Sequence, residues 1–326
     1  MKRDVETGKP GPTPEHTFAT RLLACVSYGA VSVSITLFNK AVFSVYKFHF
    51  PAAFTTMQIA VSILYMYILR HFKLMEFGRI TRASARAVFP LALFWWLYVV
   101  SGVTALRYLN VPMYSVFRRS TTFIVVIGEY MMFSKIPSLP TMGSILLMVV
   151  GAVVAGATDL TYSLPGYIWV SICAVSTAVY LLLIRMLKDK TGLSQSALML
   201  YNNVLGLPLM LSYMVVATDE VKQVPLFPKL YDATFLAFLL LSASQAFLLN
   251  LCIFRCTTVN SPLATTVTGQ MKDIITTGLG MFLFGDVVFN MKNLLGVCIG
   301  LAGGIVYSLL SYSERTRVVK EDRSKS

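Results

Sequence analysis

Two long apolar stretches of this chain contain charged side chains that a lipid bilayer would disfavour. The first stretch carries Arg118, Arg119 and Glu129, and the second carries Lys272. Ionisable groups inside apolar helices are costly and commonly mark a substrate or ion pathway. Arginine forms bidentate hydrogen bonds with phosphate, and lysine supplies a compact positive charge. Three such cations facing one cavity would therefore suit a ligand with several negative charges.

An alternative explanation is that these charges neutralise one another. The two arginines would then pair with Glu129, and Lys272 would pair with Asp273 or Asp286. The two stretches themselves hold only one Glu and one Asp. Pairing therefore fits a single residue better than it fits all three cations together.

Helical geometry places the polar side chains of each stretch on one face. At about 100° per residue, Tyr114, Arg118 and Glu129 share a stripe, and Lys272 shares a stripe with Thr265. The two stretches are therefore expected to present matching polar, cationic faces.

A third apolar run contains Tyr201, Asn202 and Asn203. Two adjacent amides in hydrocarbon need hydrogen-bond partners. The two amides could hydrogen-bond to the edge of a nucleobase, and Tyr201 or Tyr114 could stack on the base. Capping of a helix break, or hydrogen bonding between helices, would explain the amides as well. Lys40, near the end of the first apolar run, leaves a similar choice between binding substrate and reaching towards the interface.

The composition indicates what must hold these residues in place. Of 326 residues, 56% are hydrophobic and 13% are charged, whereas soluble domains are about 45–50% apolar and about 25% charged. A water-soluble fold, a disordered chain and a disulfide scaffold are therefore excluded. Three His and five scattered Cys predict no metal or other cofactor.

A spanning helix needs about 20 mostly apolar residues. The sequence accordingly predicts an all-α polytopic membrane protein with ten transmembrane helices. These lie near 20–44, 52–70, 87–106, 112–133, 140–157, 166–185, 197–217, 233–254, 262–284 and 293–312. A series of glycines in the last of them predicts close helix packing.

Basic residues predict the orientation, because Lys and Arg concentrate on the cytoplasmic side. Nineteen lie on the side of the termini and five on the opposite side, which predicts that both termini are cytosolic. The polar start of the chain fits neither a secretory signal nor a transit peptide. We expect a cytosolic tail over 1–19, helix halves over 20–157 and 158–312, and a second cytosolic tail over 313–326.

The two halves resemble each other at an offset of 150 residues. Asn110 and Pro112 precede the fourth helix as Asn260 and Pro262 precede the ninth, and a glycine follows at the same place in each. Because five helices is an odd number, the halves must be inverted relative to each other. Two inverted five-helix repeats, with a substrate site between them, are typical of secondary transporters.

These motifs give the chain a resemblance to the nucleotide-sugar transporters of the drug/metabolite transporter superfamily. The resemblance rests on Phe38-Asn39-Lys40, Val111-Pro112-Met113-Tyr114 with Phe117-Arg118-Arg119, Tyr201-Asn202-Asn203, and Gly269-Gln270-Met271-Lys272-Asp273. It implies ten helices in two inverted halves that exchange a nucleotide sugar for a nucleoside monophosphate. It also implies nucleotide contacts at Tyr201, Asn202 and Asn203, a phosphate contact at Lys272, and a candidate binding residue at Gln270.

The motif around Lys272 narrows the substrate that the resemblance implies. GDP-mannose carriers have Gly-Ala-Leu-Asn-Lys, whereas this chain has Gly269-Gln270-Met271-Lys272 and lacks the Asn. The pattern is more similar to plant UDP-N-acetylglucosamine transporters. The implied activity is import of a UDP-sugar, with UDP-N-acetylglucosamine favoured, from the cytosol into the Golgi or ER lumen in exchange for UMP. The implied partners are these nucleotides and the bilayer, without nucleic acid, and a homodimer is left open.

Two other functions remain open at this point. One is a GDP-mannose or other phosphorylated-sugar carrier of the same superfamily. The other is a polytopic membrane glycosyltransferase, which would need an acidic pair for a metal. Asp219 and Glu220 stand alone in a loop, and the three His lie near span ends. The sequence therefore favours a transporter over an enzyme.

Overall fold

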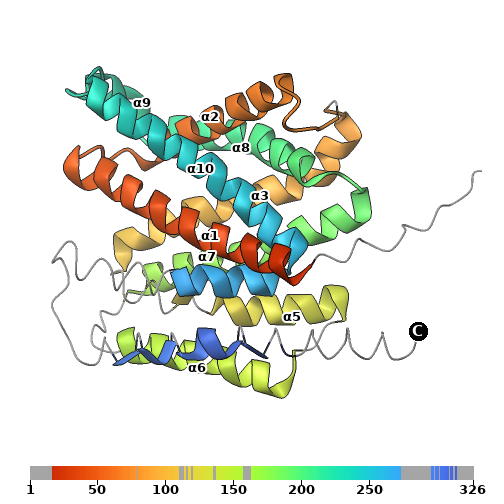
Figure 1. The fold of residues 1–326 in the computed structure, drawn as a ribbon. Coiled ribbons are helices and arrows are strands. Elements are labelled where there is room, and N and C mark those ends of the chain that lie inside the picture. Colours follow the sequence, from red (N-terminus) through yellow and green to blue (C-terminus); the bar gives the residue numbers. More distant parts are fainter. Residues whose placement is uncertain are drawn as a thin grey trace, which may run out of the picture.

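All regular structure in the described part of the chain is helical. The computed structural model describes residues 17–78, 80–109, 114, 117–118, 120–134, 137–156 and 163–272, and parts of 295–313 (Figure 1). Six helices are long and apolar enough to cross a membrane. They are α1 (Phe18–Lys40), α2 (Pro51–His71), α3 (Arg82–Tyr108), α7 (Leu164–Thr191), α8 (Gln195–Ala217) and α10 (Ala233–Val259).

Shorter helices complete the described bundle. They are α5 (Thr121–Phe133), α6 (Leu139–Gly156), α9 (Glu220–Gln223) and an unlabelled helix over 262–272, with a π-helical turn at Ala41–Val45 and a 3₁₀ turn at Val224–Leu226. The spans predicted near 112–133, 262–284 and 293–312 fall partly outside the described residues. The all-helical membrane architecture is confirmed over the residues described, and the ten-helix repeat stays a prediction.

Several helices, among them α3, α7 and α10, are longer than predicted. α3 begins at Arg82 because the Thr81 side chain accepts a hydrogen bond from the backbone N–H of Ser84 at 3.3 Å. α7 continues beyond position 185, where the predicted span ended at a cation, and ends only at Gly192, whose φ is 63°. A charge limits the part of a helix that enters hydrocarbon but does not end the helix; a left-handed glycine does.

Two helices begin with Pro, and a carboxylate from a distant segment caps each of them. α2 starts at Pro51, and Glu220 accepts hydrogen bonds from the N–H groups of Ala52 (3.3 Å) and Ala53 (2.7 Å). Helix 262–272 is capped in the same way, as described below. The first amides of a helix lack intrahelical acceptors, so a buried start needs such a partner.

Asp232 caps α10 locally. Its carboxylate accepts a hydrogen bond from the Thr234 N–H at 2.8 Å. This hydrogen bond to the charged form lowers the pKa of Asp232 below its usual value. The cap fixes where the helix leaves the preceding turn.

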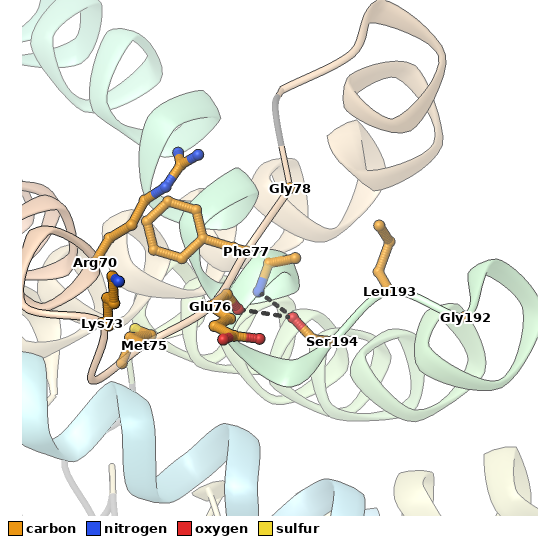
Figure 2. A pocket seen from close by; sticks show the side chains of 10 residues that line it. Arg70, Lys73, Met75, Glu76, Phe77, Gly78, Gly192, Leu193 and Ser194 are labelled. Atoms are coloured by element: carbon orange, nitrogen blue, oxygen red, sulfur yellow. Dashed lines mark hydrogen bonds between the residues drawn. The ribbon is translucent and has the colours of Figure 1, made fainter.

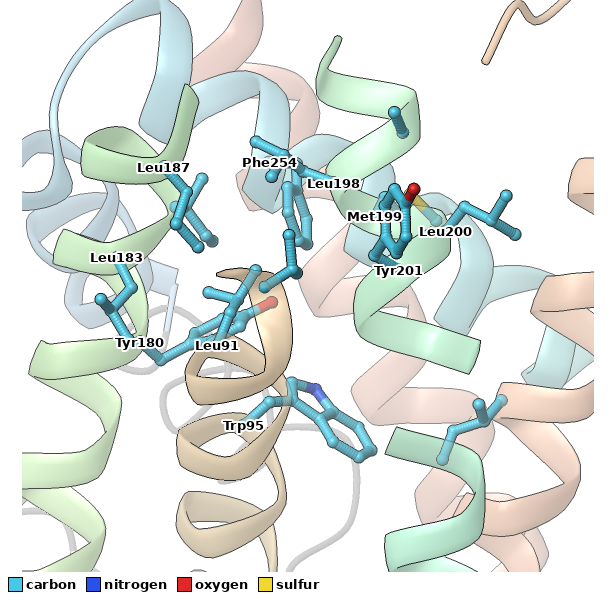
Figure 3. Packing of buried hydrophobic residues seen from close by; sticks show 14 of the residues in the cluster. Leu91, Trp95, Tyr180, Leu183, Leu187, Leu198, Met199, Leu200, Tyr201 and Phe254 are labelled. Atoms are coloured by element: carbon cyan, nitrogen blue, oxygen red, sulfur yellow. The ribbon is translucent and has the colours of Figure 1, made fainter. Parts of the chain in front are cut away.

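The largest apolar core forms where α3 lies between α7 and α8. Leu91 and Trp95 of α3 pack with Tyr180 of α7, Leu198 of α8 and Phe254 of α10 (Figure 3). A second, aromatic cluster joins the segment after α1 to α2 and α10. These contacts fix how α3, α7 and α10 are rotated about their axes, and therefore which side chains they present to each other.

Close glycine contacts join α6 to the helical segment described in parts of 295–307, as predicted. A Cβ at Gly151 would lie 2.5 Å from the backbone nitrogen of Gly300, and one at Gly303 would lie 2.9 Å from the backbone nitrogen of Met148. In Figure 1 this segment runs beside α6 at one edge of the bundle. Only glycine allows backbones to approach so closely.

Candidate functional site

A central cavity of about 90 Å³ lies among α1, α3, α5, α7, α10 and helix 262–272. Its lining includes one cation and several hydroxyl groups. The lining residues include Tyr28, Tyr98, Arg118, Thr121, Tyr180 and Gln270. They come from both of the predicted halves, 20–157 and 158–312, which is where a transporter of this architecture would bind substrate.

Two residues predicted from the sequence, Arg118 and Gln270, lie in this cavity. The Gln270 side-chain amide donates a hydrogen bond to the hydroxyl of Thr122, which links helix 262–272 to α5. Arg118 lies one turn before α5 and keeps an exposed side chain. The cavity therefore combines a guanidinium group with an amide from the opposite half.

Three tyrosines in the cavity were not predicted. Tyr28 lies on α1, Tyr98 on α3 and Tyr180 on α7, and the rings of Tyr98 and Tyr180 have centroids 5.5 Å apart. A Cβ at Gly269 would lie 3.0 Å from the Tyr28 hydroxyl, so the glycine leaves room for that side chain. Tyrosines of membrane proteins are enriched at the membrane interfaces, so a tyrosine in the middle of a span is unusual. This unusual position could have identified the three tyrosines from the sequence.

The tyrosine–amide motif of α8 lies outside the central cavity. The Tyr201 hydroxyl oxygen accepts a hydrogen bond from the Thr81 N–H at 2.9 Å, just before α3. The Asn203 amide donates to the Met66 sulfur at 3.9 Å. Asn202 is 1% exposed, and neither polar atom of its side chain has a partner among the described residues.

Four further predicted residues do not line the cavity as described. The Tyr114 hydroxyl lies 3.7 Å from the Cys173 sulfur, against α3 and α7. Lys272, the last described residue of helix 262–272, is half-buried and lies two positions beyond Gln270. Lys40 ends α1, but its side chain, like all of Arg119, falls outside the described residues.

Glu129 binds backbone at the start of the cavity-lining helix 262–272. Its carboxylate accepts a hydrogen bond from the Leu263 N–H at 3.0 Å, and Glu129 is only 6% exposed. Ser261 caps the next amide, that of Ala264, at 3.0 Å. Since Pro262 has no N–H, the Leu263 and Ala264 amides at the buried start of this helix both have acceptors. Glu129 therefore holds α5 to a helix that carries part of the cavity wall.

A larger, open hollow of about 550 Å³ lies between the α2–α3 connection and the α7–α8 turn (Figure 2). The Arg70 guanidinium lies 5.0 Å above the Phe77 ring, and the Ser194 hydroxyl donates to the Glu76 carbonyl at 3.5 Å. Its cations, Arg70 and Lys73, lie at the end of α2 and in the α2–α3 connection. Basic residues next to a membrane span are attracted to acidic lipid headgroups. None of the predicted substrate-binding residues lines it.

The sequence profile of the Triose-phosphate Transporter family matches residues 19–308, nearly the whole chain. The chain belongs to this family. A UDP-N-acetylglucosamine transporter of Arabidopsis thaliana is 35% identical over 87% of this chain and 86% of its own length. A UDP-galactose/UDP-glucose transporter of the same plant is 32% identical, covering 92% of this chain and 93% of its own. The protein is a transporter and not an enzyme.

A solved structure supports the fold. It superposes with a TM-score of 0.69 over 91% of this chain and 99% of its own length, at 13% sequence identity. At that identity the likeness shows a shared fold and nothing about substrate. The overall helical fold of this transporter is therefore also found in a solved structure.

Proposed function

We propose that this transporter is a nucleotide-sugar antiporter. It moves a UDP-sugar, with UDP-N-acetylglucosamine favoured, from the cytosol into the Golgi or ER lumen in exchange for UMP. The relatives whose names specify UDP-sugars cover most of the chain and support a uridine nucleotide. The departure from the GDP-mannose motif next to Lys272 supports the same choice.

The observation that carries the proposal is the central cavity. Arg118, Tyr28, Tyr98, Tyr180 and Gln270 all line it. A guanidinium binds phosphate oxygens, aromatic rings stack on bases or sugars, and an amide reads a polar edge. These are the three groups that a nucleotide sugar presents.

The size of the cavity supports alternating access. Pockets for ligands of this kind usually measure about 300–1,000 Å³, whereas the central cavity measures about 90 Å³. A nucleotide sugar can therefore enter only if the surrounding helices separate. Two inverted five-helix halves, with both termini in the cytosol, would allow the site to open to each side in turn.

The amides of α8 join the site in a more open state of this cycle. Asn202 and Asn203 are buried, and the two amides together leave three polar atoms without partners among the described residues. Buried polar groups normally have partners. Movement of α8 against α2 and α3 would expose the amides to the nucleoside, while Lys40, Arg119 and Lys272 add positive charge for the phosphates.

Charge balance favours exchange. UMP carries about two negative charges at neutral pH, because the second phosphate pKa is near 6, and a UDP-sugar carries about the same charge. One-for-one exchange therefore moves little net charge.

Uptake into proteoliposomes tests the proposal. Vesicles preloaded with UMP should take up labelled UDP-N-acetylglucosamine, and vesicles without UMP should take up little. Arg118→Ala should abolish exchange, whereas Arg107→Ala, which removes an exposed arginine outside the central cavity, should not. Equal uptake with and without internal UMP, or full exchange by Arg118→Ala, would overturn the proposal.

A ligand panel identifies the base. UMP should raise the melting temperature of the purified protein more than GMP, CMP or inorganic phosphate does. A larger shift with GMP would instead support a GDP-mannose carrier. The shift should disappear in Arg118→Ala and persist in Arg107→Ala.

A further inference from the structure

We infer that the hydroxyl groups of Thr121 and Tyr180 bind the phosphate groups of the nucleotide and complete an anion subsite with Arg118. The inference deepens the proposed function and rests on it. Thr121 begins α5, Tyr180 lies on α7, and Arg118 precedes Thr121 by one helical turn. All three residues line the central cavity.

Both hydroxyl groups are buried without a partner. Thr121 and Tyr180 are each 2% exposed, and neither hydroxyl forms a hydrogen bond within the described part of the chain. A buried polar group without a partner is costly, and native proteins contain few of them. An unmet hydrogen-bonding group in the wall of a binding cavity is therefore explained most simply by a ligand that meets it.

The other threonines in the cavity wall are different. Thr177 donates to the Cys173 carbonyl at 2.7 Å, Thr265 to the Ser261 carbonyl, and Thr266 to the Pro262 carbonyl. Each of these hydroxyls is satisfied by its own helix, which is the usual arrangement for membrane threonines. The two unmet hydroxyls are thus a property of particular positions and not of the cavity wall in general.

The surroundings of the Tyr180 ring sharpen the inference. The ring packs against Phe254, with centroids 6.2 Å apart (Figure 3). It also packs against the ring of Tyr98. Leu91 belongs to the same apolar cluster. Phenylalanine would fill this space equally well and would leave no unmet hydroxyl. The packing therefore accounts for the ring, and the hydroxyl remains to be explained by the ligand.

The chemistry of the cluster selects the ligand class. A guanidinium only donates hydrogen bonds, and the hydroxyls of Thr121 and Tyr180 are both able to donate. Three donors that line one cavity, one of them positively charged, suit a group that offers only acceptor oxygens. Phosphate is such a group, whereas uracil and an N-acetylhexosamine each present donors as well.

Removing the hydroxyls one at a time tests the inference in the full-length purified transporter. Thr121→Val and Tyr180→Phe should each weaken UMP binding about tenfold, since a hydrogen bond to a charged group is worth about 1.5 kcal/mol or more and tenfold corresponds to about 1.4 kcal/mol. Uridine, which lacks phosphate, should bind these variants as it binds the parent protein. Thr104→Val, which removes a hydroxyl satisfied by the Val100 carbonyl on α3 and outside the central cavity, should leave UMP affinity within twofold.

Three results would overturn the inference. One is UMP affinity within twofold of the parent in both variants. Another is an equal loss of uridine and UMP affinity, which would make the hydroxyls nucleoside contacts. The third is a lower melting temperature without ligand and an unchanged UMP affinity, which would make them structural. Inorganic phosphate serves as a further probe. Binding of inorganic phosphate as tight as that of UMP would indicate a general anion site, whereas weaker binding supports a nucleotide site. Absence of any UMP binding by the parent protein would instead overturn the proposed function.

Discussion

Replacing Glu129 with alanine should weaken nucleotide binding although Glu129 does not line the central cavity. Its carboxylate accepts a hydrogen bond from the Leu263 N–H at 3.0 Å, at the start of helix 262–272. That helix contributes Thr265, Gly269 and Gln270 to the cavity wall. The carboxylate is therefore expected to position the wall and not to contact the ligand.

The structure sets the size of the effect. Glu129→Ala leaves a buried N–H without an acceptor, which costs about 1–3 kcal/mol, and removes a negative charge from a helix N-terminus, worth about 0.3–1 kcal/mol. If ligand binding must restore the order of this helix, each 1.4 kcal/mol lowers affinity about tenfold. We expect UMP to bind Glu129→Ala about tenfold or more weakly. Glu129→Gln keeps an acceptor oxygen and should lose about two- to fivefold.

Glu220 provides a matched control. It is a buried carboxylate that caps the start of α2 through Ala52 and Ala53, and no residue of α2 lines the central cavity. Glu220→Ala should lower the melting temperature about as much as Glu129→Ala, while UMP affinity stays within twofold. Titration calorimetry with UMP and thermal unfolding of both variants make the comparison. If both variants lose stability equally and both retain UMP affinity, Glu129 has no positioning role.

Three other predictions follow from close contacts and unmet groups. Gly269→Ala places a Cβ 3.0 Å from a cavity tyrosine hydroxyl and should reduce UDP-N-acetylglucosamine exchange several-fold, whereas Gly29→Ala, with its nearest neighbour at 4.0 Å, should not. The sulfurs of Cys25 and Cys256 lie 3.5 Å apart between α1 and α10, so oxidation with copper phenanthroline should join them in a disulfide. Mass spectrometry should detect this disulfide, and exchange should slow when it forms. Cys25→Ser should prevent both effects. Asn202→Leu removes an unmet buried amide and should raise the melting temperature by a few degrees while reducing exchange; unchanged exchange would exclude Asn202 from the nucleotide site.

Sequence reasoning located the helices well because the bilayer imposes a simple rule. A spanning segment must satisfy its own backbone hydrogen bonds, so long apolar runs become helices. α2 and α8 follow the predicted ranges closely. The ends of α3 and α7 differ because Thr81 and Gly192 set them through local capping, whereas the predicted ends relied on charge.

The candidate site was only partly predictable for a related reason. Arg118 stood out because a charge is rare in an apolar run, and the structure places it in the central cavity. Asn202 and Asn203 stood out because two adjacent amides are also unusual in an apolar run, yet they are buried between α8 and its neighbours. Residue type shows that a side chain is unusual, but it does not show the direction in which the helix turns it.

The sequence by itself determined that this chain is an all-helical membrane protein. That property depends on composition and on the length of apolar runs, whereas the motifs supplied a resemblance to nucleotide-sugar transporters. Only the tertiary structure decided that Tyr28, Tyr180 and Arg118 line one cavity, and that Glu129 caps a helix from the other predicted half. In a span that is apolar on nearly every side, hydrophobic periodicity does not specify rotation about the helix axis. Packing against the neighbouring helices fixes that rotation, and with it the side chains that face the ligand.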